Sequence, residues 1–227
     1  MKIKKSVLSL ALVLSLFSAF AVAQNDKDKK PVSEPQKVEK PTVPVLKAAP
    51  PRKKGEPLDL PEVEGWEKAE TVKYPQKELG YIVNYDGFGG SRVSVYVYNG
   101  GRSDIKNTLT GAVKEEIEKA KSEIDMIAEM GMYTDVKVVT DEKTKLGGKT
   151  GKIDVLRKVL SYKARGNPLH SEIIIFPFEG DFVKFRATRL KSSGLEAEEG
   201  MNKLLAEIEA FFLMYMEVAD AAKPAVK

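Results

Sequence analysis

The side chains that most often perform chemistry in proteins are scarce in this sequence. It contains one histidine, His170, and no cysteine. These counts exclude a zinc site built from histidine and cysteine, and they exclude a cysteine–histidine nucleophile pair. No serine stands in a G-x-S-x-G elbow, so a serine nucleophile would need this one histidine. Because His170 follows a Gly-Asn-Pro turn, we expect it in an exposed or edge-strand position without a catalytic role.

Two glycine-rich stretches have the composition of phosphate-binding loops but lack the required spacing. A Walker A loop needs a glycine five residues before its Gly-Lys-Ser/Thr, and the residue five before Gly148 is Lys143. The stretch at 87–90, Gly-Phe-Gly-Gly, lacks the second spacing of a dinucleotide fingerprint and lies between two predicted strands. Both stretches therefore predict hairpin turns.

Carboxylates are abundant, but no motif arranges them for catalysis or metal binding. There is no D-x-D-x-D-G calcium loop, and most Asp and Glu residues alternate with lysines on the polar faces of predicted helices. A glycosidase-like pair of carboxylates stays open as an alternative, because its members would be distant in the sequence. We predict no catalytic, metal-binding or cofactor-binding residue, and hence no enzyme and no cofactor.

Aromatic side chains are the remaining candidates for binding. Tyr85, Phe88, Tyr96 and Tyr98 fall on one predicted hairpin. Tyrosine combines a large contact area with a polar tip, which suits a recognition surface. These four residues are our candidate partner surface, and packing of the same rings into the core is the alternative.

Period-two alternation predicts strands, and apolar residues at three- and four-residue spacing predict helices. The predicted strands span 81–85, 92–98, 134–140, 152–162, 170–178 and 182–190, and the predicted helices span 107–130 and 195–215. The segment at 58–80 is expected to have no regular element.

Four successive apolar residues, Ile173 to Phe176, indicate the layers of this fold. A strand with one wet face should alternate between apolar and polar residues, so both faces of this strand must be covered. We therefore predict an α+β fold: an antiparallel sheet of about six strands with one long helix on each face, an α/β/α sandwich. The strand at 134–140 is expected at an edge, because it carries Asp135 and Lys137.

The first 23 residues have the order of parts of a secretory signal peptide. Lys2, Lys4 and Lys5 precede an apolar run at 6–20, and Ala21-Val22-Ala23 supplies the small residues of a cleavage site. A retained membrane anchor is the alternative, but the run is at the short limit for crossing about 30 Å of hydrocarbon. We predict cleavage before Gln24, a secreted or periplasmic location, and no stable membrane insertion afterwards.

Residues 24–57 differ from the rest of the chain, with seven prolines, nine Lys or Arg and five Asp or Glu. Such a segment buries too little apolar surface to offset its ordering entropy, so we predict a disordered linker. Residues 58–220 are predicted to form a single α+β domain, and 221–227 a frayed tail. Residues 58–227 carry 25 basic and 28 acidic residues, a net charge of −3, which argues against nucleic-acid binding.

The order of elements from Trp66 to Tyr215 resembles that of the PsbP/DcrB-like α/β/α domains of exported proteins. The shared layout is a Gly65-Trp66 segment, a hairpin, a long helix, a meander of longer strands and a closing helix. The resemblance implies an accessory or binding role rather than one chemistry, and no site residue comes with it.

These observations predict an exported, non-enzymatic binding or accessory protein of the bacterial envelope, with an unknown protein or small molecule as its partner. One alternative is a TonB-like envelope protein, in which an uncleaved N-terminal segment anchors the chain and the linker projects the domain. A secreted hydrolase is a further alternative. It would show a concave cluster of carboxylates, or a serine near His170.

Sequencing the N-terminus of the mature protein separates export from anchoring. We expect it to begin at Gln24, because the small residues at 21–23 follow the apolar run. Recovery of Met1 on protein from the membrane fraction would contradict this prediction and favour the anchored alternative.

Overall fold

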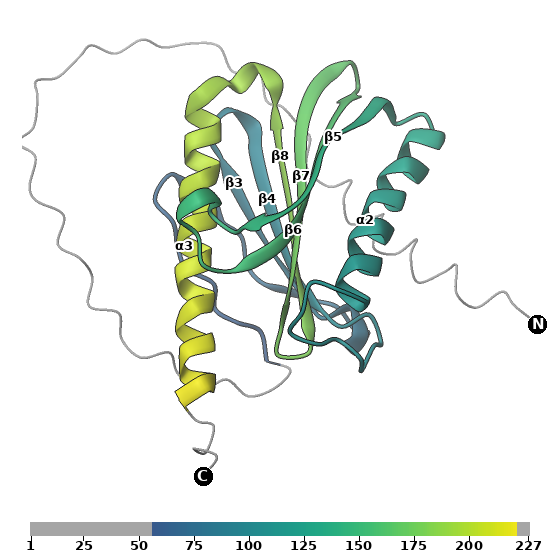
Figure 1. The fold of residues 1–227 in the computed structure, drawn as a ribbon. Helices are drawn as coiled ribbons and strands as arrows, with labels where there is room; N and C mark the ends of the chain where they lie inside the picture. Colours follow the sequence, from purple (N-terminus) through teal and green to yellow (C-terminus); the bar gives the residue numbers. More distant parts are fainter. Residues whose placement is uncertain (1–55, 222–227) are drawn as a thin grey trace, which may run out of the picture. The chain divides into compact units, whose positions relative to one another are not determined.

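The structure is a computed structural model that describes residues 56–221 (Figure 1). The predicted signal peptide, nearly all of the predicted linker and residues 222–227 lie outside the described residues. Between residues 56 and 221, no helix is long and apolar enough to cross a membrane.

Eight strands form one antiparallel sheet, in the order β1-β3-β4-β8-β7-β6-β5, with β2 paired to β3 off this path. The strands are β1 (Trp66–Lys68), β2 (Val72–Lys73), β3 (Tyr81–Gly87), β4 (Ser91–Tyr98), β5 (Tyr133–Lys145), β6 (Asp154–Ala164), β7 (Asn167–Phe178) and β8 (Asp181–Leu190). The α+β class is confirmed, but the prediction of about six strands was too low. The two extra strands lie in the segment expected to be irregular, where Trp66 of β1 donates its Nε1–H to the Gly200 carbonyl at 3.1 Å.

Two helices cover the sheet, α2 (Ala112–Glu129) and α3 (Gly194–Ala221). Figure 1 shows them on opposite sides of the sheet. The buried apolar residues accordingly form two clusters, one under each helix. The four successive apolar side chains of β7 divide between the clusters: Ile173 and Ile175 face α2, whereas Ile174 and Phe176 face α3. Each is at most 2% exposed.

Helix α2 begins five residues later than the sequence predicted. Its N-cap is Gly111, whose φ of 54° lies outside the helical region. The predicted start was too early because Leu109 is four residues before Val113, a spacing that fits a helix. Leu109 lies in the irregular segment before the helix and packs, half-buried, against both apolar clusters.

Two tight turns fix the register of the meander β6-β7-β8. Arg165-Gly166 joins β6 to β7, and Glu179-Gly180 joins β7 to β8, between the pairs Ala164↔Asn167 and Phe178↔Asp181. All four turn residues have positive φ, at 51° and 82° in each turn. This geometry matches the twist of antiparallel strands and favours glycine at the second position.

Strand β5 is an edge of the sheet, as predicted. Its pairing with β6 is interrupted by two bulges, and charged side chains alternate along it. Both features hinder pairing of an edge strand with another chain. They protect an edge that exposes Val138 and Val139.

His170 belongs to an ion cluster on the α3 side of β6 and β7, and the prediction that it is exposed or on an edge strand was wrong. His170 is half-buried on β7, an interior strand, and not on an edge. Its Nε2 lies 2.9 Å from Glu172 Oε1, and Arg157 Nε donates to Glu172 Oε2 at 2.8 Å. Burial alone raises the pKa of Glu172, but the hydrogen bonds and charges of His170 and Arg157 outweigh it and lower that pKa to about 2.

Glu172 should make the stability of the domain depend on pH. Because its folded-state pKa of about 2 is below the ordinary 4.5, its contribution is full above pH 4.5 and is lost as the pH falls towards 2. The loss is on the order of 2 to 3 kcal/mol. Urea unfolding followed by the fluorescence of Trp66, the only tryptophan, measures it.

Glu172→Gln should flatten the pH dependence of unfolding between pH 4.5 and 2. Glu64→Gln is the matched control. Glu64 also has a lowered pKa, because of its hydrogen bond with Lys203, but it is fully exposed and should contribute little. An equally steep loss of stability in Glu172→Gln and the unmodified protein would show that other groups cause it.

Candidate functional site

Strands β6 and β7 separate at one end of the sheet. Their last pair at this end is Leu156↔Ile175, yet β7 continues beside β8 as far as the pair Phe178↔Asp181. Pro177 lies in the stretch that β6 no longer accompanies, and a proline has no N–H to donate to a neighbouring strand. The first residues of β6 pair only with β5.

The loop between β5 and β6 turns towards α3, where the buried Glu209 holds it. The backbone N–H groups of Lys152 and Ile153 both donate to Glu209 Oε1, at 2.7 Å each. Gly151 is required for this path, because a Cβ there would lie 1.7 Å from the Leu146 carbonyl oxygen. The glycine-rich stretch is thus a hairpin turn, as predicted.

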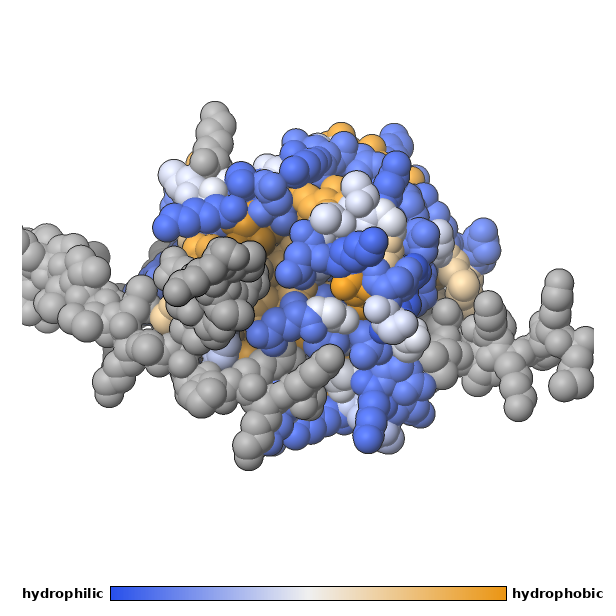
Figure 2. All heavy atoms as spheres, turned by 60° about the horizontal axis from the view of Figure 1, so that its bottom comes forward, coloured by the Kyte–Doolittle hydropathy of each residue, from blue (hydrophilic) through white to orange (hydrophobic). Residues whose placement is uncertain are grey.

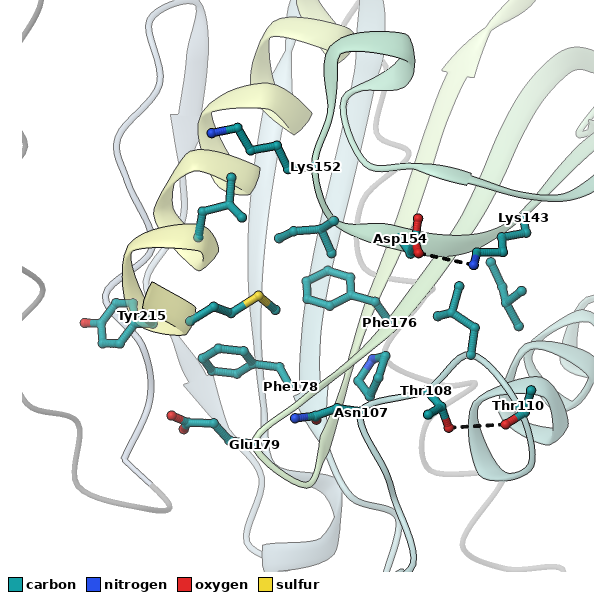
Figure 3. Close-up of a pocket in the computed structure, with 16 residues that line it drawn as sticks. Asn107, Thr108, Thr110, Lys143, Lys152, Asp154, Phe176, Phe178, Glu179 and Tyr215 are labelled. Atoms are coloured by element: carbon teal, nitrogen blue, oxygen red, sulfur yellow. Dashed lines mark hydrogen bonds and ion pairs between the residues drawn. The ribbon is translucent and has the colours of Figure 1, made fainter. Parts of the chain in front are cut away.

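The gap between the separated strands is a cavity of about 800 Å³ (Figure 3). Its walls come from the ends of β6 and β7, the last described turns of α3, and the segment before α2. Phe176 and Phe178 point into the space between α3 and that segment. The other apolar wall residues are Leu109, Ile153, Leu156, Pro177, Leu213, Tyr215 and Met216.

Figure 2, which turns the bottom of Figure 1 forward, shows hydrophobic surface bordered by hydrophilic residues. The C-terminal end of α3 and the segment before α2 lie at this end of the molecule. The apolar walls belong to both layers of the core, because Phe176 and Phe178 are part of the cluster under α3, whereas Leu156 packs against the cluster under α2.

The charged groups that line the cavity balance one another: Lys143 and Lys152 against Asp154 and Glu179. Asp154 lies 2.7 Å from Lys145 Nζ and 3.1 Å from Lys143 Nζ. These hydrogen bonds, the one with Lys145 first, hold the pKa of Asp154 below its usual value. The rim therefore has no net charge to attract an ion.

Uncharged polar groups lie on the side of the cavity formed by the segment before α2. Asn107, Thr108 and Thr110 contribute an amide and two hydroxyls to the lining. The two threonine Oγ1 atoms lie 3.2 Å apart and are exposed (Figure 3). These groups can donate to or accept from a polar end of a ligand whose body lies on the apolar wall.

The structure does not bring the four residues of the candidate partner surface together. Tyr85 is buried on the α3 side of the sheet, whereas Tyr96 and Tyr98 are buried on the α2 side. Phe88 alone is exposed, at 58%, in the turn between β3 and β4. The alternative of core packing therefore describes the three tyrosines.

The hydrolase alternative named a serine near His170, and Ser161 is the register partner of His170 on β6. Within residues 56–221 no hydrogen bond joins their side chains, and Glu172 is shared with Arg157. Both residues lie within strands that pair on both sides, so their backbone N–H groups are occupied by the sheet. These two N–H groups are therefore not free to donate to an oxyanion.

No group of three or more His, Asp or Glu side chains in the described part of the chain is placed to hold a metal ion. The cavity offers apolar contact over most of its wall and hydrogen-bonding groups at one side.

Comparison with known families and with curated proteins gave no match. Among solved structures, the chain is similar to the solution structure of cyanobacterial PsbP (CyanoP) from Synechocystis sp. PCC 6803. The match covers 64% of this chain and 81% of that chain, with 15% identity and a TM-score of 0.43. A likeness at this level carries no argument about function, and no residue or role is transferred from that protein.

Glu209 should be more important to the domain than its neighbours on α3. Glu209→Ala removes the acceptor of two backbone N–H groups and should cost about 2 to 4 kcal/mol of unfolding free energy. Amide hydrogen exchange at Lys152 and Ile153 should accelerate. Glu207→Ala, in the same helix but exposed, is the matched control. Equal effects of the two substitutions would contradict a holding role for Glu209.

Proposed function

We propose that this chain is an exported, non-enzymatic binding protein whose ligand is an uncharged, largely apolar small molecule. The ligand binds in the cavity between the separated ends of β6 and β7. The observation that carries the proposal is the cavity itself, about 800 Å³ with aromatic and aliphatic walls. Ligand sites in proteins are typically about 300 to 1,000 Å³ and mostly apolar, with a few polar groups that set orientation.

The balance of charge around the cavity favours an uncharged ligand. A charged group that enters an apolar site loses hydration, and it needs an opposite charge or several hydrogen bonds in return. Asp154 already pairs with Lys143 and Lys145, and Glu179 has an interaction of its own. Phe176 and Phe178 instead offer ring faces and edges, which suit an aromatic or aliphatic body.

Export belongs to the same proposal and is supported by the sequence of the first 23 residues. A small apolar molecule outside the cytoplasm needs a carrier or a receptor that shields it from water. The proline- and lysine-rich segment at 24–57 would give a binding domain reach from an attachment point, because such composition favours extended chain. An anchored, uncleaved chain stays as the alternative.

Titration with N-phenyl-1-naphthylamine, an uncharged fluorophore that brightens in apolar surroundings, tests the proposal. We expect saturable binding of one molecule per chain. Leu213→Trp adds bulk at a half-buried position of the cavity wall and should weaken binding at least tenfold. Val139→Trp makes the same kind of change at an exposed site on β5 and should leave binding unchanged.

Circular dichroism must show that both variants are folded before their affinities are compared. Absence of saturable binding to the unmodified chain would overturn the proposed ligand class. Equal affinity of Leu213→Trp and the unmodified chain would place the site elsewhere than in the cavity.

A further inference from the structure

Part of the α2 side of the sheet is polar rather than apolar. Helix α2 lies over β5, β6 and β7. On β3, β4 and β8 the residues that face the same side are polar over a continuous area, whereas their neighbours facing α3 are apolar. The polar positions are Asn84, Asp86, Arg92, Ser94, Arg186 and Thr188. Ser94 and Thr188 are buried and the other four are half-buried, so this area is polar and only partly exposed.

Arg186 lies near the middle of this polar area, with hydroxyl partners. Its Nε donates to Ser171 Oγ at 3.0 Å, and its Nη2 donates to the Tyr162 hydroxyl at 3.1 Å. Ser171 in turn lies 3.0 Å from Thr188 Oγ1. Among residues 56–221, no carboxylate oxygen lies within 4.0 Å of the Arg186 guanidinium.

Four other arginines of the domain each pair with a carboxylate. Arg92 binds Asp86, Arg102 binds Asp104 and Glu115, Arg157 binds Glu172 and Glu142, and Arg189 binds Glu198. Arg186 has no such carboxylate partner among the described residues. It is half-buried, and a charge without a partner is costly in such a position.

One edge of the Arg186 guanidinium is not fully used by hydrogen bonds within residues 56–221. Nη1 has no hydrogen-bond partner among the described residues. The buried side-chain atoms without partners are Ser91 Oγ and Glu123 Oε1, so Nη1 is not one of the buried atoms. The edge formed by Nη1 and Nη2 can therefore reach a molecule that approaches this face of the sheet.

The two charged residues on the α2 face of β8, Lys184 and Arg186, are both cations. Lys184, two residues earlier on the same face, lies over the rings of Tyr96 and Tyr98, at 4.9 and 5.0 Å from their centroids. The nearby carboxylates, Glu116 and Glu123, belong to α2, and the Tyr98 hydroxyl donates to Glu116 at 2.7 Å. Both act on Lys184, whereas the largest charge interactions of Arg186 are with Tyr162 and Tyr133.

The charge of Arg186 affects the pKa of the Tyr162 hydroxyl. Burial raises the pKa of its hydroxyl, but the charge of Arg186 and the surrounding hydrogen bonds outweigh that effect and lower the pKa below its ordinary value. The half-buried Tyr133 packs beside Tyr162, with ring centroids 4.4 Å apart and the rings tilted by 32°.

We infer that Arg186, held in place by the buried hydroxyls of Ser171 and Tyr162, binds an oxyanion group, a carboxylate or a phosphate, at the polar area on the α2 side of the sheet. The planar guanidinium presents parallel N–H donors that match two oxygens of such a group. The site is separate from the cavity at the β6–β7 gap, so each can exist without the other.

Titrations of the ¹⁵N-labelled chain with inorganic phosphate and with acetate test this site, at an ionic strength held constant with sodium chloride. We expect saturable shifts of the Ser171 and Thr188 amides, with a dissociation constant on the order of 1 mM or below. Stronger binding of one anion identifies its class. Shifts without saturation, or shifts confined to exposed lysines such as Lys143, would overturn the inference.

Arg186→Lys keeps the charge but loses the paired donors, and it should weaken anion binding at least tenfold. Arg189→Lys is the matched control, because Arg189 lies on the other face of β8 and pairs with Glu198. If Arg186→Lys does not fold, Tyr162→Phe removes one hydroxyl with little change of volume and should weaken binding several-fold. Binding that no substitution at Arg186 or Tyr162 alters would contradict the site.

Discussion

Strand β7 is buried on both of its faces, and the rest of the structure depends on that burial. Each face places two large apolar side chains against a helix, Ile173 and Ile175 under α2 and Ile174 and Phe176 under α3. Each such side chain contributes about 1.5 to 3 kcal/mol when it is withdrawn from water. Two helices on opposite sides are therefore required. Because α2 lies mainly over β5 to β7, part of the same side of β3, β4 and β8 carries polar residues.

The cavity follows from the same strand. Beyond Ile175, β7 no longer pairs with β6. Pro177, two residues further on, has no backbone N–H to donate to a neighbouring strand. Glu209 then draws the loop before β6 onto α3, so a gap opens between layers that are elsewhere tightly packed. The walls of this gap are core residues, and a ligand there would replace contacts that the separated strands have lost. Binding should therefore also stabilise the fold.

The sequence predicted the helices and the longer strands, because each of them is long enough for its spacing of apolar residues to repeat. The run from Ile173 to Phe176 indicated a strand covered on both faces, and apolar spacing located both helices. Strands of three and two residues, such as β1 and β2, cannot display alternation. The side on which Tyr85 and Tyr96 lie depends on the register Tyr85↔Val93, which a hairpin sequence does not fix alone. The cavity could not be predicted in the same way, because its walls come from segments that are distant in the sequence. The local indication of a strand end was Pro177, which lies within a predicted strand.

Nuclear Overhauser contacts between bound N-phenyl-1-naphthylamine and the methyl groups of the protein would locate the ligand most directly. If the separation of β6 from β7 creates the binding site, the same ligand must contact Leu109 before α2, Leu156 on β6 and Leu213 on α3. These residues line one cavity but come from three parts of the chain. Contacts confined to exposed apolar residues such as Val138 and Val139 of β5, with none to these three leucines, would contradict the account.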